Sequence, residues 1–357
     1  MSNPPSHDFT NAPANLGRRG LVAGGNWIVD HVKIIDSWPP QDALVNILDQ
    51  TKANGGSPYN ILIDLARLGA DFALLGIGLV GDDDDGQYVR QDCTRYGIDQ
   101  TRLQTTRAVA TSYTDVMTVK STGRRTFFHQ RGANAHLGPE HFDFRGVVAR
   151  HFHLGYALLL DRLDAEQKGV PAMATVFAAA REAGMTTSLD CVSESSDRFA
   201  SVVRPVLGEV DLFFANDFEA ERITGIPVRT GENLDRKAAE RATRRLVELG
   251  VRQWAVLHFP EGACACSNKG EFIWQGSVRI PASEIRGAAG AGDAFAAGVL
   301  FGWHEGWNFS ESLRVGVCAA ASCLRDVTCS GGVLSREESL QFGNQWGFRE
   351  YSGENGT

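Results

Sequence analysis

The sequence predicts an α/β protein with a doubly wound, mostly parallel sheet flanked by helices on both faces. Short apolar runs alternate along the chain with longer helical patterns, an order typical of βαβ units. Hydrophobic residues make up 43% of the 357 residues, which is ample for a large buried core. One region alternates with period two instead, and this departure predicts a small additional β-sheet.

The parallel sheet is expected from six apolar runs of strand length: Leu21–Gly24, Phe72–Ile77, Val148–Leu154, Thr186–Asp190, Leu212–Ala215 and Trp254–Leu257. Helical patterns lie between and after these runs: Asn60–Leu68, Gln87–Tyr96, Ala165–Ala183, Asp235–Leu249, Asp293–Glu305 and Ser310–Leu324. Proline is tolerated at the start of a helix but not in its interior, so the third helix is expected to begin near Pro171.

Residues 111–130 predict a β-hairpin. Tyr113–Val119 alternates with period two, Ser121–Gly123 predicts a turn, and Thr126–Phe128 resumes the extended pattern. A second extended segment is expected near residues 31–38. The two segments predict a small sheet over one edge of the core, unless the hairpin is a plain surface feature. We therefore expect one domain at residues 21–340, with disordered tails at 1–20 and 341–357.

Charge and composition restrict the kinds of partner. The net charge is −8, and no basic run exceeds a pair such as Arg124-Arg125, which argues against nucleic acid as a partner. No segment has the apolar length of a membrane helix or the core of a signal peptide, so a cytoplasmic protein without a membrane partner is expected. The seven cysteines lack the paired spacing of zinc sites and are expected to be reduced.

The segment Gly287–Phe295 joins small residues, an acid and the start of an apolar helical pattern. Glycine and alanine let the backbone approach a ligand, and the amides that open a helix point toward negative charge. Gly290, Ala291 and Gly292 are therefore candidates for an anion hole. A carboxylate at this place, Asp293, can take a proton from a hydroxyl that attacks a phosphoryl group. The alternative is an ordinary helix N-terminus built from small residues.

Polar residues follow several of the apolar runs, where ligands bind in open α/β sheets: Asp30, Asp190, Asn216 and Asp293. No G-x-x-x-x-G-K-S/T phosphate loop occurs, which excludes a P-loop kinase. Gly76–Gly81 has the spacing of a dinucleotide fingerprint, and this spacing is the whole basis for a nicotinamide-dependent oxidoreductase. The four aspartates that follow it would oppose a pyrophosphate.

Five segments, in a fixed order, resemble the ribokinase-like sugar kinases, also called the PfkB carbohydrate kinase family. They extend over most of the chain, roughly from Leu21 to Gly332: Gly25–Asp30, Asn54–Asn60, Gly78–Gly86, Asn216–Glu219 and Gly290–Asp293. The resemblance implies a ribokinase-like fold and an ATP-dependent kinase for a sugar or sugar-like alcohol, with Asp293 as the base. It also implies that the small sheet is a lid over the sugar, through which two chains form a homodimer in several members.

The resemblance assigns further residues to the site. Asp30, the Gly56 backbone and the Asn60 amide would bind sugar hydroxyls. Asn216 and Glu219 would position Mg²⁺ and the phosphates of ATP. Local structure offers an alternative for each side chain: Asp30 as a turn residue, Asn60 as a helix cap and Glu219 as a first-turn acid favoured by the helix dipole.

Arg131, in the segment that returns from lid to core, is a further candidate contact to the substrate, or else part of a surface ion pair. The chain also departs from the family pattern. Gly287, Ala288 and Ala289 replace an Asp and a Thr that help many relatives to bind a monovalent cation, so weak or absent activation by K⁺ is expected. His153–Tyr156 lacks the Glu that ribokinase has near the middle strand, which predicts a different substrate pocket.

Two rival functions remain open on the same scaffold. A nucleoside kinase would differ only in an acceptor pocket that admits a purine. A sugar-binding regulator would have kept the fold and lost the transfer reaction. The segment Val256–Gly262 lacks a Thr-x-Gly common near the nucleotide phosphates, which keeps the second alternative open, whereas Asp293 argues for transfer.

Overall fold

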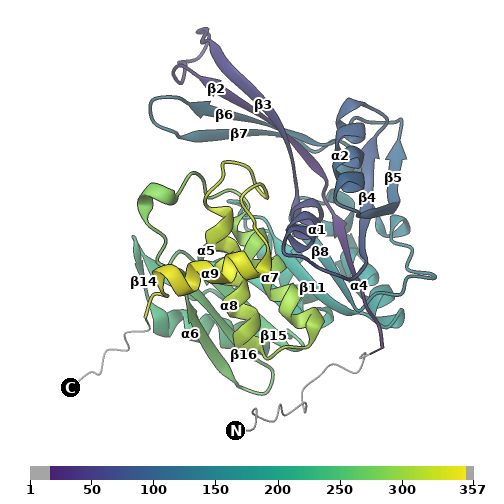
Figure 1. Ribbon diagram of the computed structural model, residues 1–357. Helices are drawn as coiled ribbons and strands as arrows, with labels where there is room; N and C mark the ends of the chain where they lie inside the picture. Colours follow the sequence, from purple (N-terminus) through teal and green to yellow (C-terminus); the bar gives the residue numbers. More distant parts are fainter. Residues whose placement is uncertain (1–16, 351–357) are drawn as a thin grey trace.

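The computed structural model describes residues 17–350 of the chain (Figure 1). Of the tails expected at residues 1–20 and 341–357, residues 1–16 and 351–357 therefore lie outside the described residues. Helix α9 (Arg336–Trp346) crosses the boundary expected at residue 341, so ordered structure continues past that point. No helix in the described range 17–350 is long and apolar enough to cross a membrane.

The large sheet is doubly wound and mostly parallel, as the sequence predicts. Within residues 17–350 it has nine strands in the order β17-β16-β15-β12-β11-β8-β1-β4-β5. The strands from β15 to β5 are parallel, and β16 and β17 join them antiparallel at one edge. Their bounds are β1 (Leu21–Gly25), β4 (Leu74–Gly81), β5 (Asp99–Thr106), β8 (His151–Ala157), β11 (Thr186–Cys191), β12 (Leu212–Asn216), β15 (Trp254–Phe259), β16 (Gly262–Ser267) and β17 (Phe272–Gly276).

All six expected strands are present, but three further strands of this sheet were not expected. Strand β5 is polar and largely exposed, with Leu103 as its buried residue, so it has no apolar run. Strand β16 is buried throughout but is built from small residues. The strand expected at 148–154 begins instead at His151, because Val148 lies exposed in the loop before it. Apolar runs therefore predict the central strands and miss those at the edges.

Helices cover both faces of the sheet. One buried cluster joins the sheet to α1 (Ser57–Arg67), α2 (Asp84–Arg95), α7 (Ala291–Glu305), α8 (Phe309–Cys323) and α9. The other joins it to α4 (Met173–Glu182), α5 (Asp217–Thr224) and α6 (Arg236–Glu248). Helix α4 begins two residues after Pro171, as expected. Short elements complete the fold: α3 (Asp161–Asp164), η1 (Gly132–His136), η2 (Pro139–His141), η3 (Phe199–Val203), η4 (Arg204–Glu209), η5 (Ala282–Glu284), β9 (Glu166–Gln167), β10 (Val170–Pro171), β13 (Arg229–Thr230) and β14 (Asn233–Leu234).

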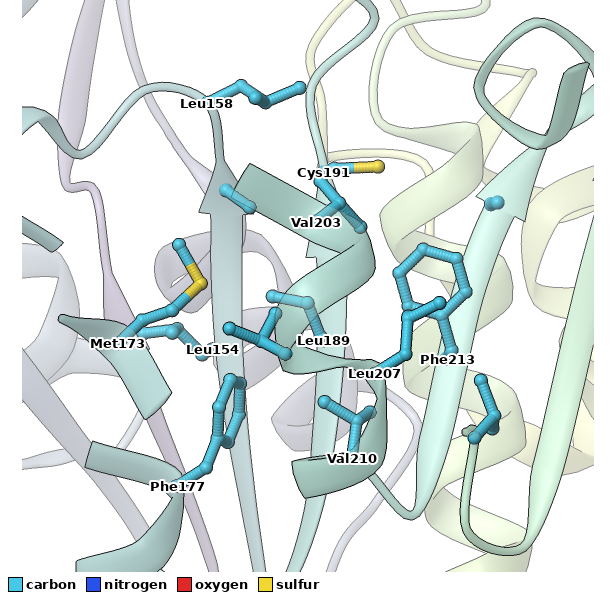
Figure 2. Packing of buried hydrophobic residues seen from close by; sticks show 14 of the residues in the cluster. Leu154, Leu158, Met173, Phe177, Leu189, Cys191, Val203, Leu207, Val210 and Phe213 are labelled. Atoms are coloured by element: carbon cyan, nitrogen blue, oxygen red, sulfur yellow. The ribbon is translucent and has the colours of Figure 1, made fainter. Parts of the chain in front are cut away.

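Figure 2 shows how the second face is packed. Phe177 of α4 and Leu207 of the short turn η4 lie against Leu154, Leu189 and Phe213, one from each of the strands β8, β11 and β12. All of these side chains are fully buried. Burial of each large apolar side chain stabilises the fold by about 1.5–3 kcal/mol, and it fixes the strand ends from which the site residues project.

A second sheet stands apart from the core (Figure 1). Within the described residues it has four strands in the order β3-β2-β6-β7, with bounds β2 (Ile28–Ile35), β3 (Ile47–Gly55), β6 (Tyr113–Val119) and β7 (Arg125–Gln130). We call these four strands the lid. The β6–β7 hairpin was predicted, and β2 overlaps the expected 31–38 segment but begins three residues earlier. Strand β3 was not expected, because its first six residues are exposed and lack an apolar alternation.

The helix pair α7–α8 should be intolerant of added volume. A Cβ on Gly298 of α7 would lie 2.8 Å from the Cα and N atoms of Gly316 in α8. We expect Gly298→Ala to lower the free energy of unfolding by about 1–3 kcal/mol, because the two backbones must separate. Urea unfolding monitored by circular dichroism would measure this. Gly208→Ala is the control, since its Cβ has no neighbour within 4 Å; equal stability of the two variants would contradict the prediction.

Candidate active site

The site forms around the N-terminus of α7. The helix begins at Ala291, and Gly290 before it has a φ of 77°, a conformation that glycine adopts readily. A Cβ on Gly290 would lie 2.0 Å from the carbonyl oxygen of Cys329, so no larger residue fits there. The amides of the first helical turn have no partner within the helix. Gly290, Ala291 and Gly292 therefore form a turn of the kind that binds anions.

Asp293 lies in the first turn of α7 and is 94% buried, with 6% of its surface exposed. Its Oδ2 accepts a hydrogen bond from Asn60 Nδ2 at 2.8 Å, and the Tyr156 hydroxyl lies 2.7 Å from both carboxylate oxygens. Burial raises the pKa of Asp293 to about 6, while the bonds from Tyr156 and Asn60 lower it. Asp293 is thus an ionised carboxylate at neutral pH and a base of matched strength.

Asn60 reaches Asp293 because of how α1 begins. Gly56 precedes the helix with a φ of 90°, and a Cβ there would lie 2.1 Å from the carbonyl oxygen of Asn26. Asn60 is the fourth residue of α1, and its backbone amide bonds to the Gly56 carbonyl at 2.9 Å. The alternative of Asn60 as a helix cap is therefore wrong. Its side chain contacts Asp293 instead, so the structure brings these two predicted residues together.

Asp30 lies within β2, not in a turn, so the turn alternative for this residue is wrong. Burial raises its pKa to about 6, and Thr114, His31 and Arg125 lower it. The Asp30 carboxylate lies 3.1 Å from the position of a Cβ on Gly55, at the end of β3 where the lid joins α1. Asp30 is therefore a half-buried acceptor at the base of the lid.

Asn216 and Glu219 form the N-terminal capping box of α5. Asn216 Oδ1 accepts from the Glu219 amide, and Glu219 Oε2 accepts from the Asn216 amide, both at 2.9 Å. Glu219 Oε1 accepts from the Ser193 hydroxyl at 2.7 Å. The structural role offered as an alternative for Glu219 is therefore real. Glu219 is nonetheless buried, and burial raises its pKa to about 7. A side chain that only caps a helix does not need to be buried in this way.

Asp190 lies beside Glu219 and completes a group of acids. One ligand atom from each of Asp190, Cys191 and Glu219 lies within 4.8 Å of the others, and all three residues are buried. Burial raises the pKa of Asp190 most, and the negative charges of Glu219 and Asp293 raise it further. Burial also raises the pKa of the Cys191 thiol, which keeps it protonated. The two carboxyl groups suit a hard cation such as Mg²⁺, whereas the protonated thiol does not suit a soft one.

Arg131 is placed differently from the expectation. Its Nη1 lies 2.5 Å from Asp161 Oδ1, and about a third of its side chain is exposed. The ion pair offered as the alternative therefore describes its contacts, and the structure does not bring it to Asp293.

Three residues near the site were not assigned from the sequence. Tyr156 was noted only as part of a segment that departs from the family pattern. Arg125 was noted only as one of a basic pair, yet its Nη2 lies 3.6 Å from the Cβ position of Gly287. Asp64 was not noted at all, although it follows Asn60 by four residues on the same helix face. An acid inside an apolar stripe was the signal available for Asp64.

His258 occupies the strand end where the family has a Thr-x-Gly segment. It is half-buried, its ring lies 3.1 Å from the Cβ position of Gly292, and it packs on Phe295 with ring centroids 5.3 Å apart. Burial lowers its pKa to about 4. A neutral imidazole thus lies beside the turn that precedes α7.

Comparison with known proteins identifies the class to which this fold and site belong. Residues 25–336 match the pfkB family carbohydrate kinase. The chain is 31% identical over 314 residues to an ATP-dependent ribose-1-phosphate kinase from Halopiger xanaduensis, covering 86% of this chain and 93% of that protein. It is 25% identical over 330 residues to ribokinase from Haemophilus influenzae, covering 91% and 98%. The solved structure of Arabidopsis thaliana ribokinase complexed with ribose and ATP has a TM-score of 0.74 at 21% identity, covering 91% and 98%.

The chain therefore belongs to the pfkB family. It is a carbohydrate kinase with the ribokinase fold. Gly76–Gly81, the basis of the oxidoreductase alternative, lies within β4, and Asp83 after it caps α2 by accepting from the Gly86 amide at 2.8 Å. These residues therefore have a structural role in this fold.

Asp64 should make stability depend on pH. It is fully buried, and neither carboxylate oxygen has a hydrogen-bond partner among the described residues. Burial raises its pKa well above 3.8, so the unfolded chain ionises Asp64 at a lower pH than the folded protein does. The stability contributed by the protonated group is complete below the unfolded pKa and is lost as the pH rises through the folded pKa.

Asp64→Asn removes this dependence. The unmodified protein should lose stability as the pH rises from 4 to 8, whereas the variant should not. We therefore expect the unfolding free energy of the variant, relative to that of the unmodified protein, to increase by at most about 1.4 kcal/mol per pH unit. Thermal unfolding across this range would measure the gain. Asp197→Asn is the control, because the Asp197 side chain is fully exposed. A constant difference for Asp64→Asn would contradict the burial argument.

Proposed function

We propose that the protein transfers the γ-phosphoryl group of ATP to a hydroxyl of a sugar or sugar-like alcohol, with Asp293 as the base. The observation that carries this proposal is a buried carboxylate of pKa about 6 in the first turn of a helix. Such a group lies where a phosphate would bind, and it can take a proton from the acceptor hydroxyl during the attack.

The backbone would stabilise the transferring group. Amides of the turn Gly290–Gly292 point to where charge develops on the phosphoryl oxygens, and they need no reorganisation during the reaction. Asn60 and Tyr156 hold the Asp293 carboxylate in one orientation. The acceptor hydroxyl would take the place of the Tyr156 bond at one of the two carboxylate oxygens, which keeps the other oxygen anchored.

The acceptor would bind between the lid and the core. Asp30 offers a carboxylate to two hydroxyls, and the Gly56 backbone and the Asn60 amide lie at the adjoining start of α1. Closure of the lid would exclude water, because water beside Asp293 would otherwise compete for the γ-phosphate. Arg131 could contact the substrate, as expected from the sequence, only if its ion pair with Asp161 broke.

Mg²⁺ would bind at Asp190 and Glu219. The amide group of Asn216 is bonded to the Ser193 hydroxyl at 2.7 Å, so Asn216 would position Glu219 and not the ion itself. When bound, Mg²⁺ supplies positive charge to the phosphates of ATP. Gly287, Ala288 and Ala289 offer no side-chain ligand, so weak or absent dependence on K⁺ remains our prediction.

The lid would also support a homodimer. Large apolar side chains are exposed on or near it, and Trp38 stacks on Phe128 with ring centroids 6.2 Å apart. These side chains are Trp38, Leu44, Ile47, Leu48, Phe127 and Phe128. An exposed group of this kind favours contact with another protein surface. A cytoplasmic location without a nucleic-acid partner remains the expectation from the sequence.

The relatives suggest three classes of acceptor. Their names describe kinases for ribose, ribose 1-phosphate and 5-dehydro-2-deoxygluconate. The last enzyme, from Geobacillus thermodenitrificans, is 24% identical over 300 residues, covering 82% of this chain and 84% of that protein. A free sugar, a sugar phosphate and a sugar acid are therefore the first acceptors to test.

The decisive experiment measures ADP release from Mg-ATP over a panel of sugars, sugar phosphates, sugar acids, polyols and nucleosides. We expect turnover with a sugar-type acceptor, and a fall by several orders of magnitude in kcat for Asp293→Asn with little change in acceptor binding. Turnover of nucleosides alone would favour the nucleoside kinase. Binding of a sugar with no turnover would favour the sugar-binding regulator, and near-normal kcat in Asp293→Asn would refute the role of the base.

Tyr156 should set the pH at which this base works. The hydroxyl favours the ionised form of Asp293, so Tyr156→Phe should raise the pKa of Asp293 above its value of about 6. The acidic limb of kcat/KM should then move to higher pH, by about one unit for a bond worth 1.5 kcal/mol. The activity should fall most near pH 6 and least near pH 8.

A pH profile of kcat/KM for both proteins checks this expectation. Tyr88→Phe is the matched control, since it also loses one hydroxyl bond, from Tyr88 to the Lys52 carbonyl. A uniform loss of activity at every pH in Tyr156→Phe would show a packing role and not an electrostatic one.

A further inference from the structure

Arg125 is a lid residue whose charged group is unpaired. It begins β7, and within residues 17–350 its side chain makes no hydrogen bond or ion pair. The arginine that the sequence favoured, Arg131, is neutralised by Asp161. A guanidinium has five N–H donors in a fixed fork that matches phosphate and carboxylate groups. Arg125 is therefore available to an anion, while Arg131 is not.

Strand pairing places Arg125 on the same face of the lid as Asp30. Arg125 lies opposite Thr118, and His129 on the same strand lies opposite Thr114. Thr114 in turn lies opposite Asp30. Directly paired residues share a face, and residues an even number apart along one strand share it too. The face that carries the Asp30 carboxylate therefore also carries the guanidinium.

The guanidinium reaches the glycine-rich turn of the core. Its Nη2 lies 3.6 Å from the Cβ position of Gly287, three residues before Gly290. Burial raises the pKa of both Asp30 and the Cys329 thiol, and the charge of Arg125 lowers both. Asp30 and Arg125 make no ion pair, so they are close enough to interact but separated enough for a ligand group to contact each of them.

We propose that Arg125 forms an anion subsite between the lid and the turn at Gly287, and that the acceptor is a sugar derivative carrying a phosphate or carboxylate group. The inference rests on the proposed function and adds the class of acceptor to it. The hydroxyls of the acceptor contact Asp30 and Asn60, its reacting hydroxyl faces Asp293, and its anionic group binds the guanidinium.

The charges around the site support this division of roles. Asp30, Asp64 and Asp293 are all acids with pKa values raised by burial. An anionic acceptor would be repelled here unless a cation offsets these carboxyl groups. A neutral sugar needs no such cation, because the Asp30 carboxylate and the Asn60 amide already supply an acceptor and a donor for hydroxyls.

The γ-phosphate of ATP is a second source of the same chemistry, since Gly287 leads into the anion-binding turn. Position favours the acceptor. Arg125 belongs to the lid and shares a face with Asp30, whereas the acids proposed for Mg²⁺, Asp190 and Glu219, belong to β11 and α5. The two possibilities are that Arg125 binds the acceptor or the γ-phosphate of ATP. The KM values for the acceptor and for ATP distinguish them.

The test compares matched acceptors that differ in one anionic group, such as ribose with ribose 1-phosphate or ribose 5-phosphate, and glucose with gluconate. We expect the unmodified protein to prefer a charged member of these pairs. Arg125→Ala should raise KM for that acceptor by about 10- to 100-fold, the loss typical of hydrogen bonds to a charged group. The KM for ATP should stay unchanged, and Arg125→Lys should restore part of the loss.

Arg124→Ala is the matched control, because it removes the same charge from the adjacent residue, which is exposed and lies in the turn just before β7. We expect it to leave the preference unchanged. Equal loss in both variants would assign the effect to general charge and overturn the subsite. A raised KM for ATP with every acceptor would place the γ-phosphate at Arg125 and overturn the assignment to the acceptor.

The failure of this inference is distinguishable from failure of the proposed function. If neutral sugars are phosphorylated and Arg125→Ala is indifferent, the kinase reaction stands and the subsite is overturned. If nothing is phosphorylated, calorimetric binding of the charged acceptors without ATP still tests the subsite. Weaker binding to Arg125→Ala than to Arg124→Ala would support it, and equal binding would overturn it.

Discussion

The hydrogen bonds to the Asp293 carboxylate join three parts of the chain that are far apart in sequence. Asn60 comes from the start of α1, Tyr156 from the end of the central strand β8, and Asp293 from the first turn of α7. A buried, ionised carboxylate without such partners would be strongly destabilising. Helices α1 and α7 must therefore lie where Asn60 and Tyr156 can both bond to Asp293. The glycine contacts at Gly56 and Gly290 then let both helices begin close enough to do so. The orientation of the Asp293 carboxylate and the packing of the core are consequently one constraint.

Burial of acids is the second theme of the site. The pKa values of Asp30 and Asp293 are raised to about 6, that of Glu219 to about 7, and those of Asp64 and Asp190 are raised as well. Five acids whose pKa values are raised by burial oppose folding at neutral pH. Clusters of this kind occur where charge must be exchanged with a ligand. Mg²⁺ at Asp190 and Glu219, and a guanidinium near Asp30, would each offset part of the repulsion.

The sequence predicted those elements that depend on residues close together in the chain. The turn at Gly290 and Asp293, the apolar central strands and the β6–β7 hairpin depend on residues close together in the chain, and all were anticipated. Edge strands β3 and β5 were missed because exposed strands are polar and lack an apolar pattern. Tyr156, Asp64 and Arg125 were not assigned because their neighbours lie far away in sequence. Their importance follows from distances to Asp293 or Gly287, which no spacing within a single segment contains.

The contrast between Arg131 and Arg125 shows why such a role needs three-dimensional evidence. Both arginines lie in the segment that leads from the hairpin turn back to the core, and the family pattern favoured the one nearer the core. Asp161 in the short helix α3 neutralises Arg131, whereas nothing described neutralises Arg125. A charge held without a partner on a lid is tolerable because it is partly hydrated when the lid is open. If the lid closes over an acceptor as proposed, that hydration would be lost, and an anionic group of the acceptor would become the partner that makes closure favourable.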